Sequence, residues 1–156
     1  MEKKCICGSC ILIEKGRTLL LFHRKLEKWM YPGGHVDEGE LPHECAIRET
    51  MEETGIGAEL LNPHGREWKK IEDSNAIDLT IPLSVIYETV KYNVGIHMHF
   101  DMVYLGRPSG LKKGIGDGES QDLEWFKEDE IDSLDTFSNV KLVIHRAFEV
   151  EYRNFK

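Results

Sequence analysis

The spacing of apolar and polar residues predicts a chain in which strands dominate and a few helices flank them. The predicted strands cover residues 4–14, 18–24, 57–68, 77–92, 94–105 and 123–126. The predicted helices cover residues 42–54, 127–134 and 140–152. The two longest connections are a loop at 29–39 with one short extended piece and a mobile loop at 107–118, rich in Gly, Pro and Lys. This order predicts one α/β domain over residues 1–156.

The segment from Pro42 to Gly55 carries the clearest helical pattern. Proline suits a first helical position, and glycine suits the position just past the end. Glu49, Glu52 and Glu53 share one face, where like-charge pairs cost a helix roughly 0.2–0.5 kcal/mol each. The opposite face is mostly apolar and comprises Ala46, Ile47, Thr50, Met51 and Thr54. A carboxylate cluster that opposes its own helix suggests a compensating cation, and hard oxygen ligands favour Mg²⁺ or Mn²⁺.

The residues around this cluster make the pattern specific. From Gly34 the chain reads Gly34, five residues, Glu40, seven residues, Arg48-Glu49-Thr50, one residue, Glu52-Glu53, one residue, Gly55-Ile56. This spacing resembles the Nudix box, G-x5-E-x7-R-E-U-x-E-E-x-G-U, in which U is a bulky aliphatic residue. The segment Trp29-Met30-Tyr31-Pro32-Gly33-Gly34 also matches the usual approach to the box. The one departure is Thr50 at the first U position, where a β-branched side chain can still pack.

The resemblance implies a fold, an activity and a set of roles. The fold would be an α/β/α sandwich with a mixed sheet. The activity would be Mg²⁺-dependent hydrolysis of a nucleoside diphosphate linked to a moiety X, giving a nucleoside monophosphate and phosphorylated X. The metal ligands would be Glu49, Glu52, Glu53 and the Gly34 carbonyl. Arg48 cannot lose its proton, so it would hold a glutamate in place, with Glu40 as the second supporting residue.

The general base and the substrate contacts are less certain on the sequence. Glu119, in the Gly-rich loop ahead of Trp125, is our candidate for the base or a closing metal ligand, with Glu124 as its rival. Closure of this loop would also bring Lys112 or Lys113 toward the phosphates. Arg24 ends a predicted strand near the Pro-Gly-Gly loop, where a cation could meet phosphate.

The cysteines and histidines leave two further patterns. Cys5, Cys7 and Cys10 form C-x-C-x2-C, but a zinc site needs a second pair of ligands, so we favour small buried residues on a strand. His97, His99 and Asp101 alternate onto one face of a strand and resemble a metal-binding pair. We favour a sheet-facing or substrate-lining role for them over a second metal site. Cys45, one turn before Glu49, reads as a packing residue rather than a nucleophile.

The composition of the chain limits the kinds of ligand and partner that we expect. The net charge of −8 argues against a nucleic-acid polymer as ligand but not against a small phosphorylated substrate bound through a metal. No long apolar run or N-terminal signal core is present, so we expect a cytoplasmic protein without a membrane partner, either a monomer or a homodimer.

Our prediction of the substrate class depends on marker residues that the sequence lacks. The tyrosine and proline that mark the diadenosine-polyphosphate and ADP-ribose branches are missing downstream of the box. We therefore expect a nucleoside triphosphate, in particular an oxidised one. The alternatives are a nucleotide-sugar or dinucleotide pyrophosphatase, and a nucleotide-binding module without activity. The complete glutamate set argues against the last of these.

Overall fold

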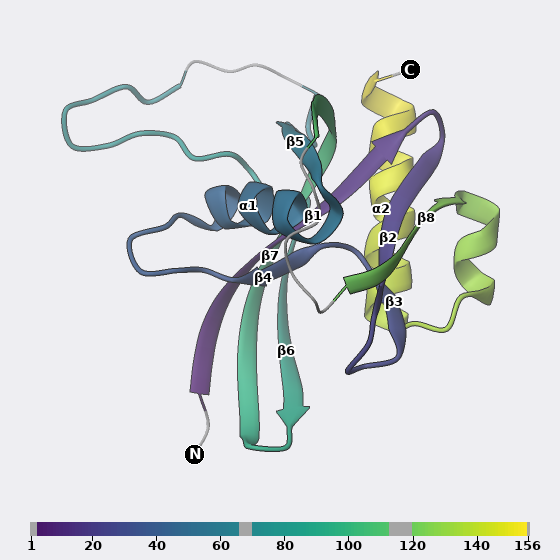
Figure 1. Ribbon diagram of the computed structural model, residues 1–156. Helices are drawn as coiled ribbons and strands as arrows, with labels where there is room; N and C mark the ends of the chain where they lie inside the picture. Colours follow the sequence, from purple (N-terminus) through teal and green to yellow (C-terminus); the bar gives the residue numbers. More distant parts are fainter. Residues whose placement is uncertain (1–2, 66–69, 113–119, 156) are drawn as a thin grey trace.

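The computed structural model describes residues 3–65, 70–112 and 120–155, and in these ranges the chain forms eight strands, two α-helices and one 3₁₀-helix. The strands are β1 Lys3–Glu14, β2 Arg17–His23, β3 Lys28–Met30, β4 Gly33–His35, β5 Ile56–Leu61, β6 Ser84–Tyr92, β7 Gly95–Lys112 and β8 Ser120–Lys127. The helices are α1 Pro42–Thr54, η1 Glu128–Ser133 and α2 Ser138–Phe155. Figure 1 shows the two long strands β1 and β7 side by side at the centre of the molecule.

The sheet is mixed. β1 and β7 are parallel over ten residue pairs, from Lys3 opposite His97 to Leu12 opposite Gly106. The other pairings are antiparallel: β4 and β2 pair with β1, β5 and β6 with β7, and β3 and β8 with β2. β7 is long enough to pair with β6 along its first half and with β5 along its second. The two longest strands therefore fix the register of the residues around them.

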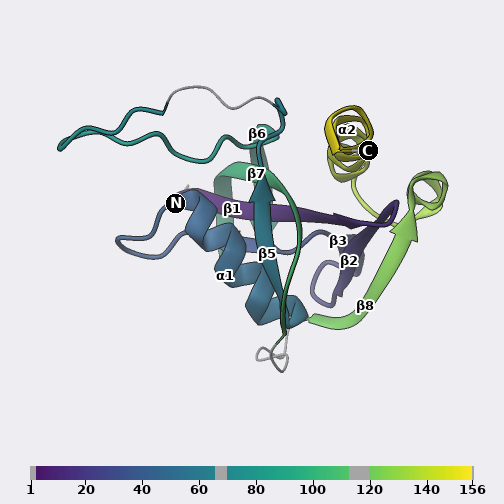
Figure 2. The same cartoon turned by 90° about the horizontal axis from the view of Figure 1, so that it is seen from above.

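Alternation along β1 assigns its side chains to two apolar layers. Cys10 and Leu12 belong to the cluster that includes Ala46 of α1. Ile11 and Ile13 belong to the cluster formed with α2, to which Val140, Val143, Ile144, Ala147 and Phe148 contribute. One helix thus covers each face of the sheet, as the end-on view shows (Figure 2). The expected α/β/α arrangement with a mixed sheet is confirmed.

Three of the predicted boundaries are wrong. The strand predicted at 57–68 ends at Leu61, because the described residues that follow, Pro63 among them, form a turn. The strand predicted at 77–92 begins only at Ser84, because the preceding residues, Pro82 among them, lie outside the ladder. Residues 107–112 were predicted as loop but extend β7, with Arg107 opposite Glu59 and Pro108 opposite Ala58. The rest of that loop, residues 113–119, lies outside the described part of the chain.

The ends of α1 agree with the prediction. Pro42 is the first helical residue, and Gly55 adopts the left-handed conformation just past the end, with φ 71°. Thr50 and Thr54 are buried, and each hydroxyl donates to the carbonyl one turn earlier. Thr50 therefore packs, as its β-branched side chain suggested, whereas Ile47 of the predicted apolar face is 37% exposed.

Candidate active site

A cleft of about 750 Å³ opens on the sheet face that α2 covers. Its walls come from β1, β2, β4, β6 and β7, together with the acidic face of α1 and the start of α2. Glu49 and Glu53 of α1 line it, and so do His99 and Asp101 of β7. The box carboxylates and the polar face of β7 therefore share one cavity, large enough for a small-molecule ligand.

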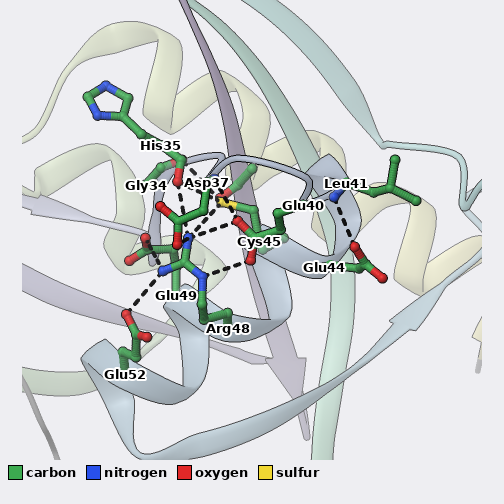
Figure 3. Close-up of polar contacts among 12 residues, drawn as sticks. Gly34, His35, Asp37, Glu40, Leu41, Glu44, Cys45, Arg48, Glu49 and Glu52 are labelled. Carbon is green, nitrogen blue, oxygen red and sulfur yellow. Dashed lines mark hydrogen bonds and ion pairs between the residues drawn. The ribbon is translucent and has the colours of Figure 1, made fainter.

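Arg48 lies at the centre of an ion-pair network (Figure 3). Its Nε and Nη2 donate to the two carboxylate oxygens of Glu40 at 2.7 and 3.0 Å. Its Nη1 donates to Glu49 Oε1 at 2.7 Å and to Glu52 Oε2 at 3.1 Å. Nη2 also donates to the backbone carbonyl of His35, which ties α1 to β4. One guanidinium thus contacts and orients three of the four acidic residues of the motif and offsets part of their negative charge.

The charges in this network stabilise one another. The hydrogen bond from Arg48 holds the pKa of Glu40 below its usual value. The carboxylates of Glu40 and Glu49 raise the pKa of Arg48, so the guanidinium stays charged at any working pH. Both partners of the Arg48–Glu40 pair are mostly shielded from solvent, with side chains 27% and 14% exposed. We therefore expect this pair to contribute more to stability than an exposed surface pair.

The Gly33-Gly34 segment approaches the carboxylates through its backbone. The N–H of Gly33 donates to Glu53 Oε2 at 2.9 Å. A Cβ built on Gly34 would lie 2.4 Å from Glu49 Oε1, so only glycine leaves room for that carboxylate. Neither glycine adopts positive φ, because both pair with β1 as part of β4. What requires glycine at these positions is the close approach of neighbouring atoms.

This donor set fits a hard divalent cation. Glu49, Glu52 and Glu53 offer carboxylate oxygens along one face of α1, and the missing side chain at Gly34 leaves room for the Glu49 carboxylate beside the backbone of β4. Oxygen ligands of this kind suit Mg²⁺ or Mn²⁺ rather than softer metals. The residue types present therefore suit the metal that the box implies, which Glu49, Glu52, Glu53 and the Gly34 carbonyl would hold.

Cys45 packs beneath this network. It is fully buried, and its thiol lies 3.4 Å from the Gly34 carbonyl oxygen and 3.3 Å from that of His35. Burial raises its pKa to about 12, so it remains a protonated thiol. This agrees with a packing residue and not with a nucleophile.

Residues on β1, β6 and β7 add a polar floor that the motif alone does not reveal. Ser9 Oγ donates to Asp101 Oδ1 at 2.8 Å, and Asn139 Nδ2 donates to Glu88 Oε2 at 3.0 Å. Burial raises the pKa of Asp101 to about 6, and burial likewise raises the pKa of Glu88. Alternation along β7 was enough to place Asp101 beside His99. The partners Ser9, Glu88 and Asn139 depend on long-range pairing and could not be read from the sequence.

The predicted substrate residues lie in different environments. His99 is buried and lines the cleft, and burial lowers its pKa to about 4. His97 is half-buried and lies near His99, with ring centroids 6.1 Å apart. Arg24 is exposed in the turn after β2, and its neighbour His23 lines the cleft instead. The structure thus brings both histidines close to the box but leaves Arg24 on the surface.

Of the two candidates for the general base, the structure describes Glu124 but not Glu119. Glu119 and Lys113 lie outside the described residues, and Lys112 is the last residue of β7. Glu124 is exposed on β8, opposite Leu20 of β2, and does not line the cleft that the described residues form. Glu124 therefore does not share the cleft with Glu49 and Glu53, and the roles of both Glu119 and Glu124 stay predictions.

Comparison with known proteins identifies the family. The NUDIX domain model matches residues 7–148, almost the whole chain. The chain belongs to the Nudix family. Its sequence is 40% identical to a mouse bis(5'-nucleosyl)-tetraphosphatase (asymmetrical) over 106 residues, 66% of this chain and 65% of that protein. It is 45% identical to a putative 8-oxo-dGTP diphosphatase of Bacillus subtilis over 51 residues, 32% of this chain and 34% of that one.

Solved structures agree with this assignment. A NUDIX-family hydrolase from Clostridium perfringens superposes with a TM-score of 0.76 at 26% identity, covering 93% of this chain and 96% of that one. The curated relatives are matched over a smaller part: this Nudix chain spans between a third and two thirds of their length. In the described residues, neither α-helix combines the length and apolar character needed to cross a membrane.

Proposed function

We propose that this Nudix chain is a Mg²⁺-dependent pyrophosphohydrolase that cleaves a nucleoside diphosphate linked to X into a nucleoside monophosphate and phosphorylated X. The observation that carries the proposal is the Arg48 network at the wall of the cleft. It holds Glu40, Glu49 and Glu52 in one arrangement, while Glu53 accepts the Gly33 N–H. A chain that only bound nucleotides would have no need to hold this many carboxylates against a phosphate-bearing ligand.

Each residue has a role in this proposal. Glu49, Glu52, Glu53 and the Gly34 carbonyl hold the metal, and Arg48 and Glu40 hold the glutamates in position. When bound, Mg²⁺ neutralises phosphate charge and makes the attacking water more acidic. Glu119 is the proposed base or closing ligand. His99 contributes to the wall of the cleft, where the nucleotide or the X group would lie, and His97 lies next to His99.

The substrate we favour is a nucleoside triphosphate, including oxidised forms, because the chain lacks the marker residues of the other branches. The Bacillus relative, a putative 8-oxo-dGTP diphosphatase, supports this choice. The second candidate is a dinucleoside polyphosphate, because the longer match is to the mouse tetraphosphatase. The cleft of about 750 Å³ lies in the usual range for small-molecule sites and is large enough for a nucleoside with its phosphates.

The deciding experiment is a substrate panel with product analysis. The purified protein is incubated with dGTP, 8-oxo-dGTP, a dinucleoside tetraphosphate and a nucleotide sugar, each with Mg²⁺ and with chelator. We expect nucleoside monophosphate and pyrophosphate from a triphosphate, no turnover in chelator, and recovery with excess Mg²⁺. Turnover in chelator would disprove the metal dependence, and no turnover of any substrate with Mg²⁺ or Mn²⁺ would favour a binding module. Glu53→Gln serves as the control for contaminating phosphatases.

A further inference from the structure

A second group of metal-ligating side chains lies near the Arg48 network and comes from three strands of the sheet. Cys5 comes from β1, His35 from β4, and His97 and His99 from β7. Each offers one ligand atom, and these four atoms all lie within 4.8 Å of one another. It is the only group of three or more close histidine, cysteine or acidic ligands found in the described residues. Figure 3 shows the His35 ring pointing away from the box carboxylates.

The register of the sheet brings these residues together. In the parallel β1–β7 pair, Cys5 is opposite His99, and the residue two before Cys5 is opposite His97. In the antiparallel β1–β4 pair, His35 is opposite Cys7, two residues after Cys5. Residues two apart on a strand, and residues opposite each other on neighbouring strands, point to the same face. All four side chains therefore converge on the face of the sheet that carries the cleft.

The distances are close to those of a four-coordinate metal. Nε2 of His35 and Nε2 of His99 lie 3.1 Å apart, and Cys5 Sγ lies 4.0 Å from His97 Nδ1. Tetrahedral coordination of Zn²⁺, with its usual bond lengths, separates two nitrogens by about 3.3 Å and a nitrogen from a sulfur by about 3.5 Å. Two imidazole nitrogens 3.1 Å apart must share a proton or a metal ion, because their lone pairs would otherwise repel. A small movement of Cys5 and His97 completes the geometry.

We propose that Cys5, His35, His97 and His99 form a Zn²⁺ site that is separate from the Mg²⁺ site of the Nudix box. One thiolate and three imidazoles are the ligands that Zn²⁺ prefers, whereas the box offers oxygens that suit Mg²⁺. The two sites therefore select different metals by their ligands.

The surroundings of the cluster support a metal site. Oε1 of Glu88 lies 3.9 Å from Nδ1 of His99, the ring nitrogen that Nε2 coordination leaves available. A carboxylate at hydrogen-bond distance orients a ligating imidazole and strengthens its bond to the metal, and Glu88 would take this part if the 3.9 Å separation shortened on metal binding. The ring of Tyr92 packs against His97, with centroids 4.7 Å apart, and restricts the rotation of that imidazole. Each of the two histidines on β7 thus has a neighbour that limits its orientation.

Occupancy of this site would restrain β4. His35 directly follows Gly34, and its carbonyl accepts a hydrogen bond from Arg48 at 3.1 Å. A metal ion bound to the His35 side chain would join β4 to β1 and β7 beside the box. Because Zn²⁺ would bind the folded chain more tightly than the unfolded one, it should raise the melting temperature in a concentration-dependent way. The proposal does not depend on nucleotide hydrolysis.

The test is a Zn²⁺ titration of the full chain, stripped of metals with chelator and then kept in excess Mg²⁺ under reducing conditions. Competition with a chromophoric chelator measures affinity and stoichiometry. We expect one tightly bound Zn²⁺ per chain, and a loss of affinity of about 100-fold or more in Cys5→Ser and in His35→Gln. His35 is exposed, so its variant should fold normally, which melting temperature and circular dichroism would verify. Cys7→Ser is the matched control, because Cys7 follows on the same strand and face but lies outside the cluster.

Cobalt substitution identifies the ligands. Bound Co²⁺ should give the visible bands of tetrahedral coordination and a sulfur-to-cobalt charge-transfer band, which Cys5→Ser removes and Cys7→Ser retains. Failure of the wild-type protein to bind Zn²⁺ in excess Mg²⁺ would overturn the proposal. It would also be overturned if Glu52→Gln and Glu53→Gln weakened Zn²⁺ binding while Cys5→Ser and His35→Gln did not, since the ion would then belong to the box.

Discussion

Arg48 contacts both carboxylate oxygens of Glu40, with Nε 2.7 Å from Oε1 and Nη2 3.0 Å from Oε2. Residues eight apart in the sequence are thereby joined in a parallel pair of hydrogen bonds that only a guanidinium can make. Because the remaining nitrogen of Arg48 reaches Glu49 and Glu52, this pair helps to set the position of the acidic face of α1, where we propose that the metal binds.

Arg48→Ala should lower the free energy of unfolding by about 1–3 kcal/mol, because it leaves shielded carboxylates without their partner. Arg48→Lys should recover little of this loss, since lysine cannot form the paired contact. Urea unfolding in chelator measures the change. The matched control is Arg107→Ala, which breaks a similar two-nitrogen pair with Glu59 whose side chains are more than half exposed. Its effect should be much smaller, and equal losses in both variants would contradict the role given to Arg48.

Gly34→Ala should impair activity more than stability. The added methyl would meet the end of the Glu49 side chain, which can move, so the fold survives while the carboxylate is displaced. Gly33→Ala should do the opposite, because its methyl would lie 2.1 Å from Ser9 Oγ and 2.8 Å from Ser9 Cα, which belongs to β1. Melting temperature and kcat, measured for both variants at saturating Mg²⁺, separate the two effects. A fully active Gly34→Ala enzyme would show that the Glu49 position is not critical.

Glu52→Gln and Glu53→Gln keep side-chain size and remove ligand charge. Each should reduce kcat by about 100-fold or more at fixed Mg²⁺, because the lost interaction stabilises the transition state. Stability should change little, since each substitution also relieves repulsion along the helix face. Glu44→Gln is the control on the same helix. Glu44 is exposed, and its carboxylate accepts a hydrogen bond from the Leu41 N–H at the start of the helix, away from the acidic face. Wild-type rates in the Glu52 and Glu53 variants would remove the cluster from catalysis.

The sequence predicted α1 well because its evidence is local. A proline at the start, a glycine just past the end and acidic residues on one turn-to-turn face are all readable within a few residues. Arg48 and Glu40 follow the same logic, as they lie on one helix and the turn before it. The composition of residues 107–112 was misleading, because the partner that makes them a strand, β5, is about fifty residues away. Local preference yields to pairing in such cases.

The proposed Zn²⁺ site could not be predicted from the sequence either, because its residues meet only through long-range strand pairing. In the sequence, Cys5 belonged to the C-x-C-x2-C pattern, whereas His97 and His99 belonged to a separate pattern of alternating polar residues. Neither pattern alone contained enough ligands for a zinc site. His35 was an unspecified position inside the box. Only the registers of β1 with β7 and of β1 with β4 show that these residues share one site.

Glu119→Gln should reduce kcat far more than it raises KM if Glu119 is the base or a closing ligand. Glu124→Gln should have little effect, because Glu124 is exposed on β8 and opposite Leu20. Steady-state kinetics of both variants at saturating Mg²⁺ make the comparison. A large loss for Glu124→Gln alone would reverse the assignment, and no loss for either would return the role of base to α1.

Asp101 provides a test of the cleft floor through pH. Burial raises its pKa to about 6, so the folded chain binds its proton more tightly than the unfolded chain. The stabilising contribution is therefore complete below the unfolded pKa and is lost as the pH rises through about 6. At pH 7 the carboxylate is ionised and buried, and it accepts a hydrogen bond from Ser9 Oγ. Because burying this charge costs free energy, Asp101→Asn should raise the free energy of unfolding at pH 7 by roughly 1–3 kcal/mol.

The same substitution should give no such gain near pH 4, where the wild-type carboxyl is already protonated in the folded state. Urea unfolding at both pH values, in chelator, measures the difference. The control is Asp73→Asn on an exposed loop, where the backbone N–H of Asn75 lowers the pKa of the carboxyl, so its effect should have the opposite sign at pH 7. A loss of stability in Asp101→Asn at pH 7 would mean that the ionised carboxylate is stabilised in the folded chain, for instance by a cation on the cleft floor.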